Sequence, residues 1–352
     1  MTQRDYLEIL AALAPGKPIR AAIDMIVRQE TGALIVLGYG NDVEAICSGG
    51  FHLNGADFSS ARVAELAKMD GAVICDAAAE VIYRANVHLL PSGNIPTSET
   101  GTRHRTAERT ALQTGRPVIV VSEGRGSVAV FTRKGRYELR NPTTLLAQAN
   151  QSLLTLERFR RRLSDAEARL TQLEVDDLAV HRDVVLLLQR AALVRRVASH
   201  VEGYAVELGG EGDIIRIQVE DLLLGVQRTG RLVYADHART HPPAISDPLV
   251  ALAEMETEHL SDPNRVAGQL ELGPLDSQAR SRGLRVLDRI PRLPEAVKAS
   301  LIERFGNLQG LLHASIGELD EVGGVGRTRA RQLRNYFDRL LDSSRGWAYD
   351  EE

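Results

Sequence analysis

The hydrophobic pattern changes near Asn141-Pro142, and this change limits the folds open to the chain more than any other feature. Upstream lie five apolar runs of strand length: 32–37, 72–75, 118–122, 127–131 and 136–139. They alternate with helical patterns, and the last two flank a Lys134-Gly135 turn. Strands mixed with helices predict an α/β domain, a mixed sheet flanked by helices, with a β-hairpin at its end.

Downstream of this point the apolar residues follow helical spacing. They recur at alternating intervals of three and four residues: Leu156, Phe159, Leu163, Ala166, Leu170 and Leu173. This spacing predicts a long amphipathic helix that joins a second helix at 183–201 in a spine. A short coiled coil and core packing within a bundle both fit the pattern.

The remaining pattern completes a three-part organisation. We expect loops at 203–212 and 237–248, while the apolar segment 214–223 fits either a helix or a strand. Short helices with intervening glycines follow near the C-terminus. The predicted domains are an α/β domain at 1–145, an all-α spine at 146–285 and an all-α C-terminal domain at 286–352.

Charge and cysteine content exclude several classes of protein. The 352 residues carry 43 basic and 47 acidic side chains, a formal net charge of −4, and 43% are hydrophobic, as in soluble globular proteins. No apolar run approaches the roughly 18 residues of a membrane span, and the N-terminus has no signal-peptide core, so a cytoplasmic protein without membrane contact is expected. Cys47 and Cys75 are too few for a four-thiolate zinc site and are expected to be reduced and buried.

A cationic helix start is the strongest candidate for a phosphate site. No lysine lies in a G-x-x-x-x-G-K-[ST] loop, so phosphate binding must rely on arginine, histidine and backbone N–H groups. Thr102 is predicted to cap a helix that ends at Gly115, and the first turn carries Arg103, His104 and Arg105. Because the macrodipole is positive there, cations are unfavourable unless an anion joins them. The pattern therefore indicates a polyphosphate site; the alternative is a solvated charged turn.

Asp70-Gly71-Ala72 directly precedes the predicted strand at 72–75. Gly71 permits close approach of a ligand to the backbone, and Asp70 is placed to hold a divalent metal. An Asp-Gly pair by itself is usually only a turn. Other polar residues support the functional interpretation: Asn94, Ser98 and Thr102 are expected around the arginine turn. The loop from Ser122 to Arg125 follows a second strand, at a position typical of ligand-binding loops.

The segment 322–330 resembles the helix-hairpin-helix pattern h-x-G-h-G-x-x-x-A. Its candidate DNA-binding residues are two turn glycines and three arginines: Gly324, Gly326, Arg327, Arg329 and Arg331. A cationic patch without base-reading side chains predicts sequence-independent binding to the DNA backbone; a purely structural glycine turn is the alternative. The stretch 290–294 resembles a degenerate first hairpin with prolines in place of glycines.

Together these motifs resemble a known family. Asp70-Gly71-Ala72 and the segment 101–108 are similar to the DGA and RHR motifs of the diadenylate cyclase domain, and the C-terminal hairpin narrows the resemblance to the DNA integrity scanning protein (DisA) family. The resemblance covers the whole chain. It implies condensation of two ATP into cyclic di-AMP with release of two pyrophosphates, and Mg²⁺ or Mn²⁺ as cofactor.

The resemblance also implies roles for individual residues. Asp70 would bind the metal and help to activate the 3′-hydroxyl, and Arg103, His104 and Arg105 would act with it in catalysis. The implied ATP-binding residues are Gly71, Ala72, Leu89, Thr102, Arg103, His104, Arg105, Thr106, Ser122 and Arg125.

A two-fold symmetric product requires one pocket to face its own copy across an isologous contact. The family resemblance implies an octamer of face-to-face tetramers with the helical middle as its spine. It further implies binding to branched or recombining DNA, which couples the state of the DNA to synthesis of the second messenger.

Two alternative functions start from the same residues. Lys68 to Gly71 matches the K-x-D-G motif of DNA ligases, in which the lysine becomes covalently adenylated. Val73 stands where that motif continues with arginine, and the zinc cysteines of the NAD-dependent class are absent. A non-enzymatic DNA-structure binding module would leave Asp70 without a role.

Overall fold

A computed structural model describes residues 10–124 and 126–346, and the chain divides into two compact units. The first unit contains 1–150 and 202–216, and the second contains 151–201 and 217–352. Within the described ranges, no helix combines the length and the apolar character needed to cross a bilayer. The predicted three-part division stays a prediction, and its boundary at 285/286 falls inside a helix, α13 (Leu284–Asp288).

The first unit is built on one eight-stranded sheet. Its strands are β1 (Ala33–Leu37), β2 (Cys47–Ser48), β3 (Phe51–Asp57), β4 (Ala72–Cys75), β5 (Val81–Leu89), β6 (Val118–Val121), β7 (Val128–Thr132) and β8 (Gly135–Leu139). Their order is β2-β5-β4-β1-β6-β7-β8, with β3 paired to β5. Because β1 and β4 are parallel and the other pairings are antiparallel, the predicted mixed sheet is confirmed.

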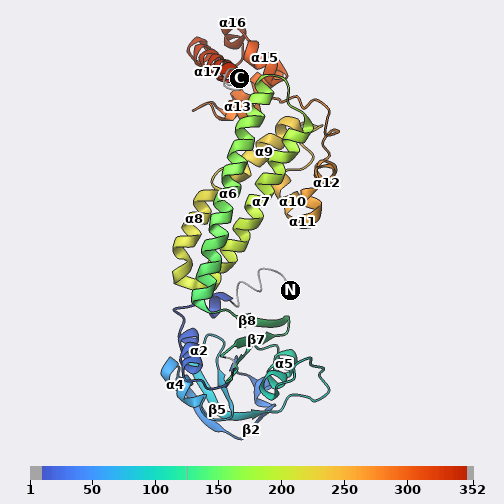
Figure 1. Ribbon diagram of the computed structural model, residues 1–352. Helices are drawn as coiled ribbons and strands as arrows, with labels where there is room; N and C mark the ends of the chain where they lie inside the picture. The colour runs from blue at the N-terminus through green and yellow to red at the C-terminus, as the bar shows by residue number, and fades with distance from the viewer. Residues whose placement is uncertain (1–9, 125, 347–352) are drawn as a thin grey trace. The chain divides into compact units, whose positions relative to one another are not determined.

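Helices cover both faces of this sheet (Figure 1). They are α2 (Pro18–Arg28), α3 (Asn41–Glu44), α4 (Ser60–Leu66) and α5 (Thr102–Thr114). Alternate residues of β1 enter two apolar clusters: Ile35 packs with α2 and α4, whereas Leu34 and Val36 pack with α5. All five residues of β1 are buried, so the run reads as continuously apolar in the sequence.

Three strands were not predicted from the sequence. β2 has only two residues, and both β2 and β3 carry exposed or half-buried side chains, so neither forms an apolar run. β5 is interrupted by register shifts against β4 and by Asn86, which has a left-handed φ of 55°. Irregular pairing of this kind breaks the two-residue periodicity on which sequence reasoning relies.

Helices form the rest of the described chain (Figure 1). They are α6 (Pro142–Val175), α7 (His181–Leu208), the 3₁₀ turn η1 (Gly209–Gly212), α8 (Asp213–Leu223), α9 (Val226–His237), α10 (Pro248–Ala253), α11 (Thr257–Ser261), α12 (Pro263–Gln269), α13, α14 (Glu295–Phe305), α15 (Leu308–His313), α16 (Ile316–Asp320) and α17 (Arg327–Gly346). The all-α prediction is therefore confirmed. In the predicted seam of α6, Leu156, Leu163, Ala166 and Leu170 are buried.

The predicted loop at 203–212 is wrong. α7 continues to Leu208, and only the glycine-rich stretch after it forms a 3₁₀ turn. Ala205 and Leu208 are fully buried in the first unit, so tertiary packing extends the helix past Gly203. The undetermined segment 214–223 is helical and lies in α8.

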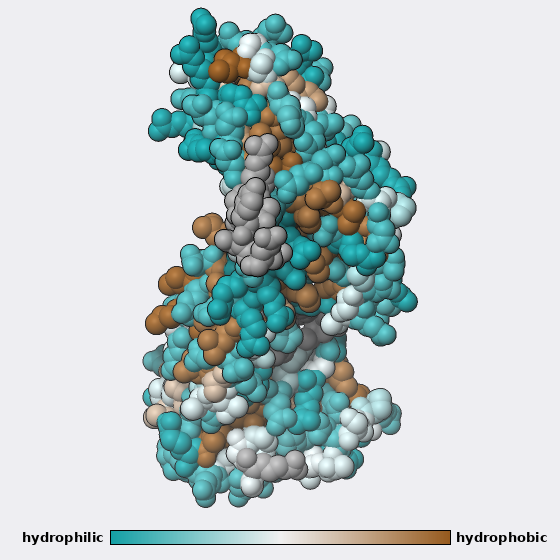
Figure 2. Space-filling view, turned by 45° about the horizontal axis from the view of Figure 1, so that its top comes forward, coloured by the Kyte–Doolittle hydropathy of each residue, from teal (hydrophilic) through white to brown (hydrophobic). Residues whose placement is uncertain are grey.

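The C-terminal helices share a core of their own in the second unit. Leu287, Leu301, Leu311, Leu333 and Phe337 are each fully buried in it. The surface is mostly hydrophilic on the face that Figure 2 shows, with hydrophobic residues gathered in separate patches. Such scattered apolar residues are usual for a globular protein.

Candidate functional site

Strand ends bring the two predicted motifs together at one end of the sheet. Asp70 and Gly71 precede β4, and Gly32 precedes the parallel strand β1. β6 runs antiparallel to β1, so its C-terminal end delivers Ser122 and Glu123 to the same place. The pairing of β4 with β5 brings the C-terminal end of β5 there as well.

Arg103 links these segments through its guanidinium group. Its Nη2 donates to Asp70 Oδ1 at 3.0 Å, and its Nη1 donates to Glu123 Oε2 at 3.4 Å. The Asp70 side chain is 93% exposed and that of Arg103 is 37% exposed. Exposed pairs contribute little to stability, so this arginine can exchange its carboxylate partners for a phosphate at small cost.

Gly32 provides the space in which Arg103 lies, and sequence reasoning missed this role. A methyl group on Gly32 would lie 2.0 Å from Arg103 Nη1. One feature of the sequence points to this role of Gly32: a glycine directly precedes each of the two parallel strands, Gly32 before β1 and Gly71 before β4.

Gly71 packs closely against the neighbouring strand, and its expected contact with a ligand stays a prediction. A methyl group there would lie 2.3 Å from the carbonyl carbon of Asn86 and 2.6 Å from the backbone nitrogen of Val87. Gly71 therefore permits a close approach of the turn to β5 of its own chain. This contact holds the Asp70 turn against the sheet.

The helix start that carries the RHR motif is confirmed, but its cap differs from the prediction. Gly101 is the N-cap, without a side-chain cap hydrogen bond, and Thr102 is the first helical residue. The helix ends at Gly115 with a left-handed φ of 72°, as predicted. Because no described side chain caps α5 and its first turn contains no acidic residue, its leading N–H groups lack a side-chain partner within residues 10–124 and 126–346 and can bind an anion.

The three ionisable residues of this turn have different environments. Arg103 reaches Asp70, whereas the half-buried His104 sets its ring edge-on to Phe131 of β7, with centroids 6.1 Å apart. Arg105 is exposed. An imidazole packed edge-on against Phe131 and a solvent-facing guanidinium, beside uncapped N–H groups, leave room for a phosphate chain at the helix start.

The other predicted nucleotide-binding residues lie in varied surroundings. Ala72 and Leu89 are buried in the apolar cluster beneath α5, Leu89 at the C-terminal end of β5. Thr102 is exposed, while Thr106 and Ser122 are half-buried. Arg125 lies outside the described residues.

The segment between β5 and α5 runs along the helix toward its start. Gln113 Oε1 accepts from the Ser92 N–H at 2.8 Å, and Arg109 Nε donates to the Ile95 carbonyl at 2.8 Å. Asn94 is therefore held near the C-terminal half of α5. Its expected place around the arginine turn stays a prediction.

The available cysteine and carboxylate side chains limit which metal ions the candidate site could bind. Burial raises the pKa of Cys75 to about 12, so it stays a thiol at neutral pH. Across residues 10–124 and 126–346, no group of three or more histidine, cysteine, aspartate or glutamate side chains could hold a metal ion. A single exposed carboxylate fits Mg²⁺, which commonly takes one or two protein carboxylates and completes its shell with phosphate and water.

The predicted DNA-binding hairpin forms the turn between α16 and α17. Gly324 has a left-handed φ of 84°, and Val325 is fully buried in the C-terminal core. Arg329 donates to the Gly324 carbonyl and so closes the turn. Arg327 and Arg331 are exposed, and among the described residues neither forms a hydrogen bond or ion pair, which leaves both free for phosphate.

The turn between α13 and α14 contains the stretch 290–294, where the degenerate first hairpin is predicted. Arg292 takes a left-handed φ of 59° in its turn. This arginine stands where a glycine would be favoured.

Comparison with known proteins finds matches to protein-family models over most of the chain. Residues 20–136 match the family model described as "DisA bacterial checkpoint controller nucleotide-binding", and residues 139–278 match "DisA bacterial checkpoint controller linker region". The DNA integrity scanning protein DisA of Acidothermus cellulolyticus is 46% identical over 95% of this chain and 93% of the relative. The protein of the same name from Kineococcus radiotolerans is 45% identical over 96% and 95%.

Among solved structures, DacA from Staphylococcus aureus is similar at 20% identity. The match covers 40% of this chain and 91% of the other, with a TM-score of 0.30.

Proposed function

Because the chain belongs to the DisA family, we propose that it is a diadenylate cyclase. It condenses two ATP into cyclic di-AMP and two pyrophosphates. Each 3′-hydroxyl loses its proton and attacks the α-phosphate of the other ATP, which releases pyrophosphate as the leaving group. The observation that carries this proposal is the Arg103–Asp70 pair beside the free N-terminus of α5.

In this reaction the helix start binds the triphosphate. Arg103, His104 and Arg105 neutralise its charge together with the backbone N–H groups of α5, and Thr102, Thr106 and Ser122 add hydroxyl groups. Gly71, Ala72 and Leu89 line the adenosine side, and Arg125 contributes a further phosphate contact. Positioning of the reactants and stabilisation of developing charge supply most of the rate enhancement.

Asp70 would hold the divalent cation, Mg²⁺ or Mn²⁺. Its carboxylate is exposed and reaches only Arg103 among the described side chains. If Arg103 contacts the phosphates instead, the Asp70 carboxylate would be available to a cation. The cation would lower the charge on the phosphates and the pKa of the attacking hydroxyl.

The second ATP comes from another copy of the chain. The Asp70–Arg103 site lies at an exposed end of the sheet, where a two-fold contact can place two such sites face to face. An octamer of face-to-face tetramers, with the α6 region as its spine, repeats this contact.

The C-terminal hairpin binds DNA without sequence preference. Arg327 and Arg331 supply free positive charge next to the Gly324 turn, and Gly326 and Arg329 complete the contact surface. Binding to branched DNA would couple DNA integrity to synthesis of cyclic di-AMP.

The ligase-type alternative fits less well. Lys68 is exposed and its Nζ pairs with Glu65 Oε1 at 2.6 Å, and the alternative assigns no role to Arg103. Incubation with α-labelled ATP and metal distinguishes the functions. A cyclase releases labelled cyclic dinucleotide, a ligase-type enzyme retains label on the protein, and a DNA-structure binding module does neither.

Asp70→Asn gives a direct test of the cyclase site. An amide is a poor metal ligand, so synthesis should be abolished, while the exposed position should leave the melting temperature unchanged. Asp57→Asn at the end of β3 is a matched control, since Asp57 pairs with Val81 at the opposite end of the sheet. Wild-type turnover by Asp70→Asn would contradict the assignment.

A further inference from the structure

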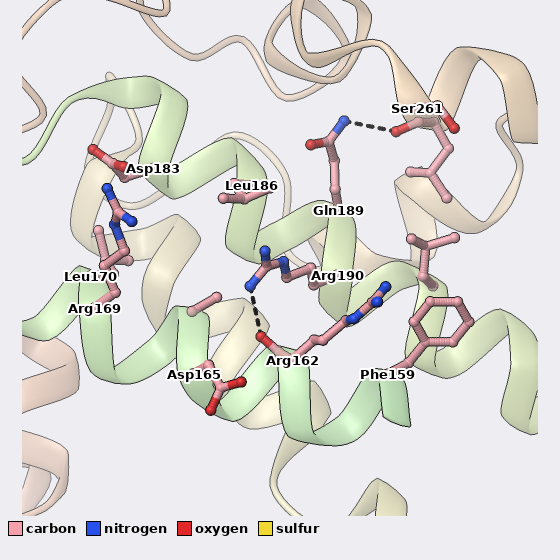
Figure 3. A pocket seen from close by; sticks show the side chains of 13 residues that line it. Phe159, Arg162, Asp165, Arg169, Leu170, Asp183, Leu186, Gln189, Arg190 and Ser261 are labelled. Atoms are coloured by element: carbon pink, nitrogen blue, oxygen red, sulfur yellow. Dashed lines mark hydrogen bonds between the residues drawn. The ribbon is translucent and has the colours of Figure 1, made fainter. Parts of the chain in front are cut away.

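A pocket in the second unit lies between α6, α7 and α11, and it shares no residue with the candidate cyclase site. Its volume of about 570 Å³ falls within the range of small-ligand sites. Figure 3 shows side chains of α6 and α7 lining it from two sides. A space of this size can take a ligand larger than a few water molecules.

The floor of the pocket is apolar. It is formed by Phe159, Ala166, Leu170, Leu193 and Leu260. Leu170 and Leu260 are each only 1% exposed, so their positions are set by the core. Gln189 Nε2 donates to the Leu260 carbonyl at 2.8 Å and ties α7 to α11. A flat ring could therefore pack against this rigid apolar surface.

Three arginines provide the charge of the pocket: Arg162, Arg169 and Arg190. Arg190 Nη1 donates to the Arg162 carbonyl at 2.8 Å, which orients its guanidinium across the pocket (Figure 3). In the described part of the chain, none of the three pairs with a carboxylate. The three lie along the pocket, Arg162 beside Phe159, Arg169 on the side of Asp183 and Arg190 between them (Figure 3). A guanidinium group without a carboxylate partner favours an anion and matches phosphate geometry.

Two carboxylates complete the lining, Asp165 on α6 and Asp183 on α7. Carboxylates accept hydrogen bonds from hydroxyl or amino groups. A ligand that satisfies all three parts of the pocket therefore has a phosphate, a flat ring, and hydroxyl or amino donors. We propose that this pocket binds a nucleotide, with its phosphate on the arginines and its base on the apolar floor. It is a second nucleotide site, separate from the cyclase site.

Equilibrium dialysis of the full-length chain with labelled AMP and labelled cyclic di-AMP tests the proposal. Arg162→Ala with Arg169→Ala should weaken one binding site per chain by at least about tenfold, which is 1.4 kcal/mol. Both side chains are exposed, and alanine is a strong helix former, so α6 should remain folded. Arg158→Ala with Arg161→Ala removes the same charge from α6 outside the pocket and should leave this site intact.

Leu186→Glu is a second, independent variant. Leu186 is 39% exposed and lines the pocket, so the change adds a negative charge without opening the core. It should weaken nucleotide binding as the arginine variants do, and more strongly at low salt.

Three results would overturn the proposal. They are equal binding by the two double-arginine variants, complete loss of nucleotide binding in Arg103→Ala, and competition by inorganic phosphate as strong as that by AMP. The first two would leave the cyclase site as the only nucleotide site, and the third would remove recognition of a base. Because dialysis measures binding alone, the outcome does not depend on whether the chain synthesises cyclic di-AMP.

Discussion

Replacing either glycine at the start of β1 and β4 by alanine should separate function from folding. A methyl group at Gly32 meets the tip of the Arg103 side chain at 2.0 Å, whereas one at Gly71 meets the backbone of Asn86 at 2.3 Å. A flexible guanidinium can move aside, but two paired strands cannot. The same chemical change therefore acts on the site in one case and on the sheet in the other.

For Gly32→Ala, the Arg103 guanidinium must shift by about 1.5 Å to reach normal contact distance. Loss of its exposed ion pair with Asp70 costs at most about 1 kcal/mol, and a gain of about 0.4–1 kcal/mol from the stiffer unfolded chain offsets this. Stability should thus stay within about 1 kcal/mol of wild type. Loss of a charge-assisted bond of about 1.5–3 kcal/mol to phosphate should lower kcat/KM by about 10- to 150-fold.

For Gly71→Ala, β5 must move away from the turn or the turn from the sheet. Overpacking of this kind costs about 1–3 kcal/mol, and the pairing of Ala72 with Val87 lies directly beside the clash. Stability should fall by about 3 kcal/mol, and activity should fall with it.

Urea unfolding and the initial rate of cyclic di-AMP formation measure the two effects. Gly93→Ala, where a methyl group meets nothing within 4 Å, is the control and should change neither. Wild-type kcat/KM in Gly32→Ala would show that Arg103 does not contact substrate. Equal destabilisation by Gly32→Ala and Gly71→Ala would refute the distinction between a flexible and a rigid neighbour.

Three further predictions concern the second unit. Arg285→Met should cost about 3–5 kcal/mol because it leaves the buried Glu174 carboxylate without its guanidinium partner, and Glu174→Gln in the same chain should recover part of that loss in urea unfolding. Burial and the Glu174 charge raise the pKa of Asp236 to about 6, so the folded chain binds this proton more tightly than the unfolded chain. Stability should therefore fall as pH rises from 4 to 6, by up to about 3 kcal/mol, and unfolding of Asp236→Asn should lack this fall. Arg327→Glu with Arg331→Glu should weaken DNA binding and flatten its salt dependence in a fluorescence-anisotropy titration, and unchanged affinity would place the DNA site elsewhere.

Local signals predicted the regular elements well. The run 33–37 is buried on both faces and is therefore visibly apolar, and Gly115 ends α5 because it takes a left-handed conformation. β3 and β5 were missed because exposed side chains and register shifts erase their period. The predicted loop at 203–212 failed because buried packing of Ala205 and Leu208 outweighs the helix-breaking tendency of Gly203.

The sequence alone determined which residues are candidates for the chemistry, since an acidic turn before a strand and a cationic helix start are each visible within a few neighbouring residues. The tertiary structure alone decided how they meet. Asp70 and Arg103 lie 33 positions apart, and Gly32 is more distant still. Strand pairing brings them to one end of the sheet, because β1 and β4 run parallel and β6 runs against them. At that end the Arg103 guanidinium lies in the space that Gly32 leaves open. Such a contact between distant segments depends on the register of the sheet rather than on local sequence.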